Sequence, residues 1–117
     1  MSNTDKTKTR PVVAFTAGTA LGTASIIDTS GWDYMTLYSQ HGGTGGSRTI
    51  SVYVNAGTRA GTAATTFPDA VLIGSKNSDQ AGAGTPVWNC GSLTDQALIS
   101  YGTSTNSSFT VSYVMRD

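Results

Sequence analysis

Residues 25–39, with the sequence SIIDTSGWDYMTLYS, constrain the fold more than any other stretch of the chain. A short apolar run leads into the polar corner DTSG, and an aromatic-rich run then begins at Trp32. Aspartate closes such corners because its carboxylate accepts a backbone N–H two residues further on. Glycine adopts a positive φ without steric cost. We therefore predict a turn between two strands, with structural roles for Asp28, Gly31 and Trp32.

Other segments show the period-two alternation or the short apolar runs that are typical of strands. Residues 49–55 alternate most clearly, and Val111 and Tyr113 share one face of the final pattern. The predicted strands cover residues 12–15, 26–27, 32–39, 49–55, 71–76, 86–90, 97–101 and 109–115. We expect five side chains to point into the core: Ile50, Val52, Val54, Val111 and Tyr113.

These patterns predict an all-β protein, an eight-stranded antiparallel β-sandwich that is jelly-roll-like. Fourteen glycines and the absence of glutamate disfavour helices. The glycine-rich residues 40–48 and the polar residues 102–108 are interpreted as hairpin connections, and residues 77–84 as a small-residue loop. The long irregular segment 56–70 has a length that suits a crossover between the two sheets.

The first ten residues differ in composition from the remainder of the chain. Residues 1–10 are polar and are predicted to form a flexible N-terminal arm, whereas residues 11–117 form a single β-sandwich domain. Two interpretations of the arm remain open. It is either a simple tail or a segment that becomes ordered on a partner, in which case Lys6, Lys8 and Arg10 would pair with acidic groups.

Charge and hydropathy limit the classes of partner. Seven acidic and seven basic residues give a formal net charge of +0, so no global field attracts nucleic acid or a membrane surface. The first residues lack the apolar core of a signal peptide, and no stretch approaches a membrane span of about 20 apolar residues. The single cysteine, Cys90, excludes an intrachain disulfide and fits a reducing compartment.

The residues that could carry out catalysis occur in contexts that favour structural roles. The only histidine, His41, lies in a predicted exposed loop, where nothing would orient it as a base. Cys90 follows Trp88 in a strand pattern and is interpreted as packing. One histidine and one cysteine do not make a zinc site, and the spacing of acids at 28–33 does not match a calcium loop. We therefore predict no enzymatic activity, no metal and no cofactor.

The aromatic side chains allow two interpretations. They could form a platform on which sugar rings stack, as in carbohydrate-binding modules, or they could be core residues and cross-strand pairs. Tyr34 and Tyr38 share a face with Thr36, because alternate residues of a strand point the same way. The tryptophans and tyrosines in question are Trp32, Tyr34, Tyr38, Tyr53, Trp88, Tyr101 and Tyr113.

The segment IDTSGWDY at 27–34, followed by an aliphatic strand and a glycine-rich turn, resembles small structural proteins of tailed bacteriophages. In that family, which includes jelly-roll capsid decoration (cement) proteins and head-fibre proteins, a corner of the form I-D-T-x-G-aromatic-D precedes a strand. Residues 73–84, IGSKNSDQAGAG, resemble the family's E-S-D-D loop, with Asp79 as the only acid here. The resemblance covers about half of the chain and brings no catalytic residue with it.

The resemblance implies a non-enzymatic virion structural protein, made in the cytoplasm of the bacterial host, that binds the outer capsid surface and stabilises it. The implied partner is the major capsid protein of the phage shell. We expect a homotrimer, which would match the local three-fold points of an icosahedral shell. The alternatives are a carbohydrate-binding or host-adhesion module of a phage tail or fibre, in which Trp32 and Trp88 would contact the glycan, and a baseplate or tail accessory protein.

Overall fold

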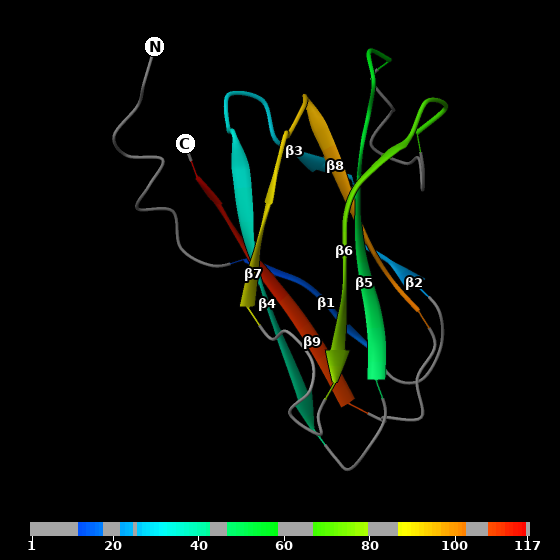
Figure 1. The fold of residues 1–117 in the computed structure, drawn as a ribbon, viewed down its shortest axis with the longest axis vertical. Coiled ribbons are helices and arrows are strands. Elements are labelled where there is room, and N and C mark those ends of the chain that lie inside the picture. The colour runs from blue at the N-terminus through cyan, green and yellow to red at the C-terminus, as the bar shows by residue number, and fades with distance from the viewer. Residues whose placement is uncertain are drawn as a thin grey trace.

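The structure is a computed structural model that describes residues 12–17, 22–24, 26–42, 47–58, 67–79, 87–102 and 108–116. These residues contain nine strands and no helix, and the strands form two antiparallel sheets that pack together (Figure 1). The predicted antiparallel β-sandwich is confirmed. The strands are β1 (Val12–Ala17), β2 (Gly22–Thr23), β3 (Ile27–Asp28), β4 (Tyr34–Gly42), β5 (Ser47–Val54), β6 (Val71–Asp79), β7 (Val87–Gly91), β8 (Gln96–Tyr101) and β9 (Ser108–Arg116).

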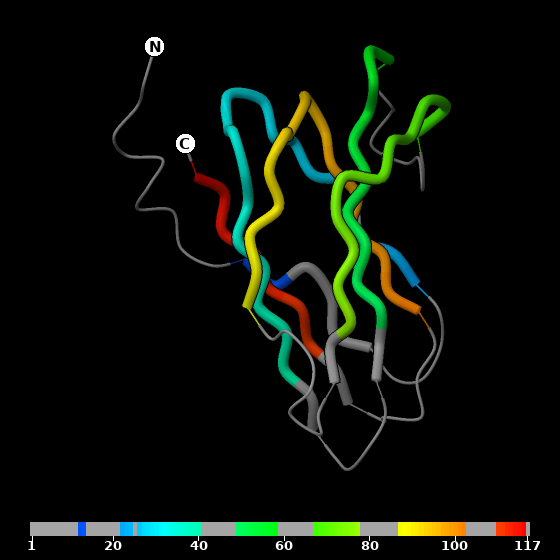
Figure 2. The backbone as a smooth tube through the Cα atoms, viewed as in Figure 1, coloured from blue at the N-terminus to red at the C-terminus, as the bar shows by residue number. Residues whose placement is uncertain are grey.

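The strands pair in a nested order. One sheet, which we call sheet A, has the order β1-β9-β4-β7. The other, sheet B, has the order β2-β8-β5-β6, with β3 also paired to β8. The first strand therefore pairs with the last, β2 and β3 pair with β8, β4 with β7, and β5 with β6. Figure 2 shows the course of the backbone between the two sheets.

Three predicted connections are wrong. Residues 40–48 and 102–108 do not close hairpins, because β4 and β9 belong to sheet A whereas β5 and β8 belong to sheet B. The long segment 56–70 does not cross between sheets, since β5 and β6 are hydrogen-bonded neighbours. Partners are chosen by matching core faces, as when Val52 lies opposite Ile99, so neighbouring strands in the sequence are often separated in space.

Several strands also extend into segments predicted to be loops. β4 continues to Gly42 and β5 begins at Ser47, so His41 lies in a strand and not in a loop. β6 continues to Asp79, so residues 77–79 lie in a strand where a loop was predicted, and residues 80–84 of that loop lie outside the described residues. The antiparallel pairing of β6 with β5 explains this extension, because paired residues continue from Val54↔Val71 as far as Ser47↔Asp79.

The ninth strand lies within the apolar-poor segment that precedes Ala24. Gly22 and Thr23 pair with Tyr101 and Ser100 of β8. A Cβ at Gly22 would overlap the ring of Tyr101, so this position accepts the aromatic side chain only because it is glycine. Two residues are too few to show an alternating pattern, which is why the sequence did not reveal this strand.

The core lies between the two sheets and is built from alternate residues of each strand. The five side chains predicted to point inward are all buried, and Ile50, Val52 and Val111 are completely inaccessible to solvent. Met35 and Leu37 of β4 are equally inaccessible and, like Val111, lie on the inner face of sheet A, whereas Ile50 and Val52 belong to sheet B. The core cluster also contains Ala24, Val54, Trp88, Cys90, Ala97, Ile99 and Tyr113.

The predicted corner is present and carries the chain from sheet B to sheet A. Asp28 Oδ1 accepts a hydrogen bond from the backbone N–H of Ser30 at 3.0 Å, and Gly31 has a φ of 82°. Thr29 is completely buried between them. Its hydroxyl donates to the carbonyl of Thr94 at 2.6 Å, and its N–H donates to the carbonyl of Asp95 at 2.9 Å. These two hydrogen bonds connect the corner to the segment between β7 and β8.

Candidate functional site: the outer face of sheet A

The outer face of sheet A presents a row of side chains from β4 with neighbours on both sides. Tyr34, Thr36 and Tyr38 alternate with the buried residues of β4 and so point away from sheet B. Cross-strand partners share a face, which extends the row into a grid of three strands. The partners are Arg116 and Gly91 for Tyr34, Val114 and Asn89 for Thr36, and Ser112 and Val87 for Tyr38.

A chain of polar contacts crosses this grid between the two tyrosines. Arg116 Nε donates to Thr36 Oγ1 at 3.2 Å, and Thr36 Oγ1 donates to Asn89 Oδ1 at 2.8 Å. Thr36 is nearly buried, at 7% exposed, and its hydroxyl both accepts and donates a hydrogen bond. It therefore holds the guanidinium on one side and the amide on the other in defined positions.

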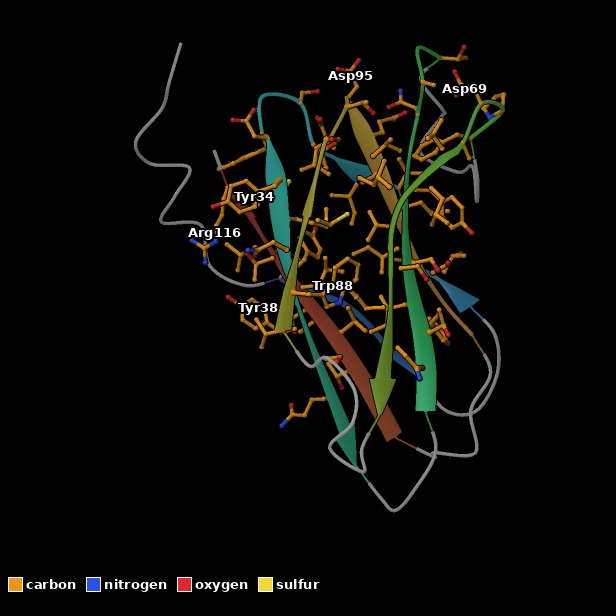
Figure 3. All side chains as sticks on the ribbon, viewed as in Figure 1. Tyr34, Tyr38, Asp69, Trp88, Asp95 and Arg116 are labelled. Carbon is orange, nitrogen blue, oxygen red and sulfur yellow. The ribbon has the colours of Figure 1, made fainter. Side chains whose placement is uncertain are left out.

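The flanking tyrosines are half-buried, and Asn89 is exposed. Figure 3 shows Tyr34, Tyr38 and Arg116 on the side of sheet A that faces away from sheet B, whereas Trp88 lies between the sheets. A Cβ at Gly91 would meet nothing within 4 Å, so the surface beside Tyr34 is open. The result is a rather flat surface on which two aromatic rings flank a cation and an amide. We call these residues, Tyr34, Thr36, Tyr38, Asn89 and Arg116, the tyrosine face.

The residues predicted to form sites lie elsewhere. Lys6, Lys8 and Arg10 fall outside the described residues. Asp28, Gly31 and Trp32 form the corner between the sheets, where the N–H of Trp32 donates to the carbonyl of Thr29 at 3.1 Å. This arrangement gives Asp28 and Gly31 the turn geometry that the sequence predicts.

The aromatic residues divide between the two interpretations offered by the sequence. Trp88 is 7% exposed and Tyr113 is 8% exposed, and both belong to the core, so a sugar platform containing Trp88 is wrong. Tyr101 packs against the same core. Tyr34 and Tyr38 are the aromatic pair that one strand of sheet A presents outward.

The groups that could carry chemistry have structural environments. Cys90 is a buried free thiol, and burial raises its pKa from 9.0 to about 11, so the thiol stays protonated at neutral pH. Asp69 Oδ2 accepts from the N–H of Thr58 at 3.1 Å. Within the described part of the chain, no three metal-binding side chains come together, and no helix is long and apolar enough to cross a membrane.

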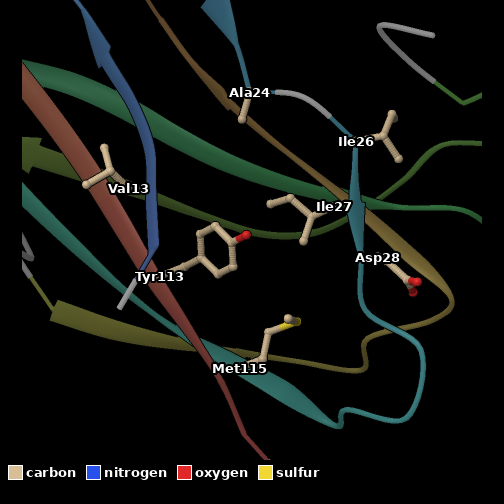
Figure 4. A pocket seen from close by; sticks show the side chains of 7 residues that line it. All are labelled: Val13, Ala24, Ile26, Ile27, Asp28, Tyr113 and Met115. Carbon is tan, nitrogen blue, oxygen red and sulfur yellow. The ribbon is translucent and has the colours of Figure 1, made fainter. Parts of the chain in front are cut away.

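A cavity of about 390 Å³ opens at another place, between β9 and the strand β3 (Figure 4). Most of its lining residues are apolar, but more of its accessible surface is polar than apolar, and the carboxylate of Asp28 already accepts the hydrogen bond from Ser30. Burial raises the pKa of the Tyr113 phenol in this wall. The lining residues are Val13, Ala24, Ile26, Ile27, Asp28, Tyr113 and Met115.

Sequence reasoning did not single out Arg116 or Asn89. The shared face of Tyr34, Thr36 and Tyr38 follows from period-two alternation. Their partners do not, because Asn89 lies 53 residues from Thr36 and Arg116 lies 80 residues from it. Only the register of β4 with β7 and β9 brings them together.

No family model matches the chain, and neither the curated proteins nor the solved structures contain a significant match.

Proposed function

We propose that this chain is a non-enzymatic structural protein of a phage virion, a capsid decoration (cement) protein that binds the outer surface of the shell and stabilises it. The observation that supports this best is the nested pairing of the strands, first with last and then inward. We interpret that order as a jelly roll, which is the fold of the phage proteins that the segment 27–34 resembles. In this interpretation β2 and β3 are two parts of one interrupted strand, because both pair with β8.

The side chains that could carry out chemistry have structural roles, which agrees with a non-enzymatic function. The Cys90 thiol packs in the core and remains protonated, which makes it a poor nucleophile. Asp28 and Asp69 accept backbone hydrogen bonds from Ser30 and Thr58 and so stabilise turns. Binding through shape and many copies suits these features better than chemistry does.

Self-association is part of the proposal, with a homotrimer as the expected state. Among the described residues, five large apolar side chains are exposed, and these five lie on the edge strands β1, β6 and β7. The most exposed is Val13, at 60%. Edge strands with exposed apolar residues favour contacts with another chain. The remaining four are Val12, Val71, Leu72 and Val87.

The proposed partner is the major capsid protein, and the proposed location is the virion surface after synthesis in the host cytoplasm. Mass spectrometry of purified particles from a phage that encodes this chain tests the assignment directly. We expect the chain to be present in many copies per particle. Its absence from particles that are otherwise complete would overturn the proposal.

A second candidate function is glycan binding by a tail or fibre module, and the tyrosine face favours it. Two tyrosines on one strand, with an ordered arginine and amide between them, provide both stacking and hydrogen-bonding groups. A glycan array on the wild type and on Tyr38→Ala tests this. Retained glycan signals after the substitution would exclude the tyrosine face as the binding surface.

A further inference from the structure

The tyrosine face has the charge and geometry of a site for an acidic sugar. Tyr34 and Tyr38 are four residues apart on an extended strand, which places them about 13 Å apart. Thr36 lies nearly buried between them, and its hydrogen-bonded neighbours Arg116 and Asn89 bring polar groups to the surface between the two rings. Sugar rings pack on aromatic side chains through their apolar C–H faces, and this spacing allows contacts with more than one ring of an oligosaccharide.

The arginine is the group that distinguishes acidic from neutral sugars. Arg116 Nε is occupied by its bond to Thr36 Oγ1, so the terminal amino groups of the guanidinium point away from the threonine. Among the described residues, the guanidinium forms no ion pair, and the grid around it contains no acidic side chain. A guanidinium binds a carboxylate through two parallel N–H···O bonds, which is the strongest polar contact available to this face.

Asn89 adds a second polar contact to the same surface. Its Oδ1 accepts from Thr36, so its exposed amide nitrogen is left to donate to an acceptor from outside. Sugar hydroxyls supply such acceptors. A nucleic acid fits less well, because the grid offers one cation and phosphate recognition needs several.

We propose that the tyrosine face binds an acidic saccharide, with Arg116 pairing with a sugar carboxylate, Tyr34 and Tyr38 contacting the rings, and Asn89 donating to a hydroxyl. Thr36 acts as a positioning residue, since it touches Arg116 and Asn89 from below. The inference rests on the second candidate function, and it adds the chemical class of the glycan.

Calorimetric titration of the full chain with three carboxylated polymers tests the inference: alginate, polygalacturonate and polysialate. Each polymer is compared with its own carboxyl-reduced form, which keeps the sugar chain and loses the charge. We expect at least one acidic polymer to bind with a dissociation constant below about 1 mM. Its reduced form should bind at least about tenfold more weakly.

Single substitutions test the role proposed for each residue in binding. Arg116→Gln should remove the preference for the acidic form, and Thr36→Val should reduce it, because the guanidinium loses its anchor. Tyr34→Ala and Tyr38→Ala should weaken both forms about tenfold. Matched controls come from sheet B, where Tyr53→Ala removes a half-buried tyrosine and Lys76→Gln removes an exposed cation. Neither control should change binding, and circular dichroism checks that every variant is folded.

Three results would contradict the inference, each in a different way. Equal binding of an acidic polymer and its reduced form would refute the acidic class but leave glycan binding in place. No binding of any polymer, in either form, would remove the glycan function as well. Equal losses in the Tyr53 and Tyr38 variants would also contradict it, since the effect would then not belong to the tyrosine face.

Discussion

Gly74 of β6 lies directly against the indole ring of Trp88 in β7. A Cβ at Gly74 would come within 2.9 Å of Trp88 Cζ3 and within 2.8 Å of Cys90 Sγ. These strands are edges of different sheets, so the contact joins sheet A to sheet B where neither sheet has a further strand. The absence of a side chain at Gly74 is what allows the tryptophan to close this edge of the sandwich.

Gly74→Ala should therefore destabilise the protein, because the new methyl group has to displace the indole or the thiol. We expect the free energy of unfolding to fall by about 1–3 kcal/mol. Gly91→Ala is the matched control, since a Cβ there meets nothing within 4 Å. Urea titration of both variants checks the prediction. Equal stabilities of the two variants would show that the edge tolerates a methyl group.

The buried threonine of the corner makes a second prediction. Thr29→Val keeps the shape of the side chain but removes the hydroxyl that donates to the carbonyl of Thr94. The carbonyl then loses a partner, so we expect a loss of about 1–3 kcal/mol in the free energy of unfolding. Thr49→Val, at an exposed position of β5, should leave stability almost unchanged. Thermal melts of the two variants separate these outcomes.

How far the sequence predicts the structure depends on the range of the interaction. The alternation of Ile50, Val52 and Val54 and the turn at Asp28 and Gly31 are local, and the structure has both. The connections are not local. Polar glycine-rich segments look alike whether they close a hairpin or cross between sheets, so the sequence of residues 40–48 does not reveal that β4 and β5 belong to different sheets.

The same limit applies to the candidate site. Period-two alternation predicts that Tyr34 and Tyr38 share a face. The contribution of Arg116 depends on the register between β4 and β9, which is fixed by long-range packing of the core faces. Trp88 was a candidate for an exposed platform, and it is buried because β7 turns it toward Gly74.

The buried thiol makes the stability depend on alkaline pH. Burial raises the pKa of Cys90 to about 11 in the folded protein, above its ordinary value of 9.0. The unfolded chain therefore releases this proton first, and stability that is fully present below pH 9 is lost as the pH rises toward 11. The raised pKa of Tyr113 acts in the same direction.

We expect the free energy of unfolding to decrease by roughly 2 kcal/mol over this interval on account of the thiol. Cys90→Ala should show a smaller decrease over the same pH range, whatever its stability at neutral pH. Urea titrations between pH 8 and pH 11 measure both slopes. Parallel slopes for the two proteins would contradict a role for the thiol.

The N-terminal arm makes a prediction about binding. Deletion of residues 1–10 should leave the melting temperature almost unchanged, because these polar residues cannot enter the core. It should weaken capsid binding if Lys6, Lys8 and Arg10 pair with acidic groups of the shell. Higher salt should then weaken the intact protein more than the truncated one. Co-sedimentation with capsids checks this, and equal binding of both forms would reduce the arm to a tail.

A density map of the intact virion tests the central claim most directly. Particles of a phage that encodes this chain are imaged, and the sandwich is fitted into density outside the major capsid protein. The account predicts three copies of the two-sheet sandwich grouped around the local three-fold points of the shell. A shell that lacks this density, with the chain found only in the tail or baseplate, would contradict the account.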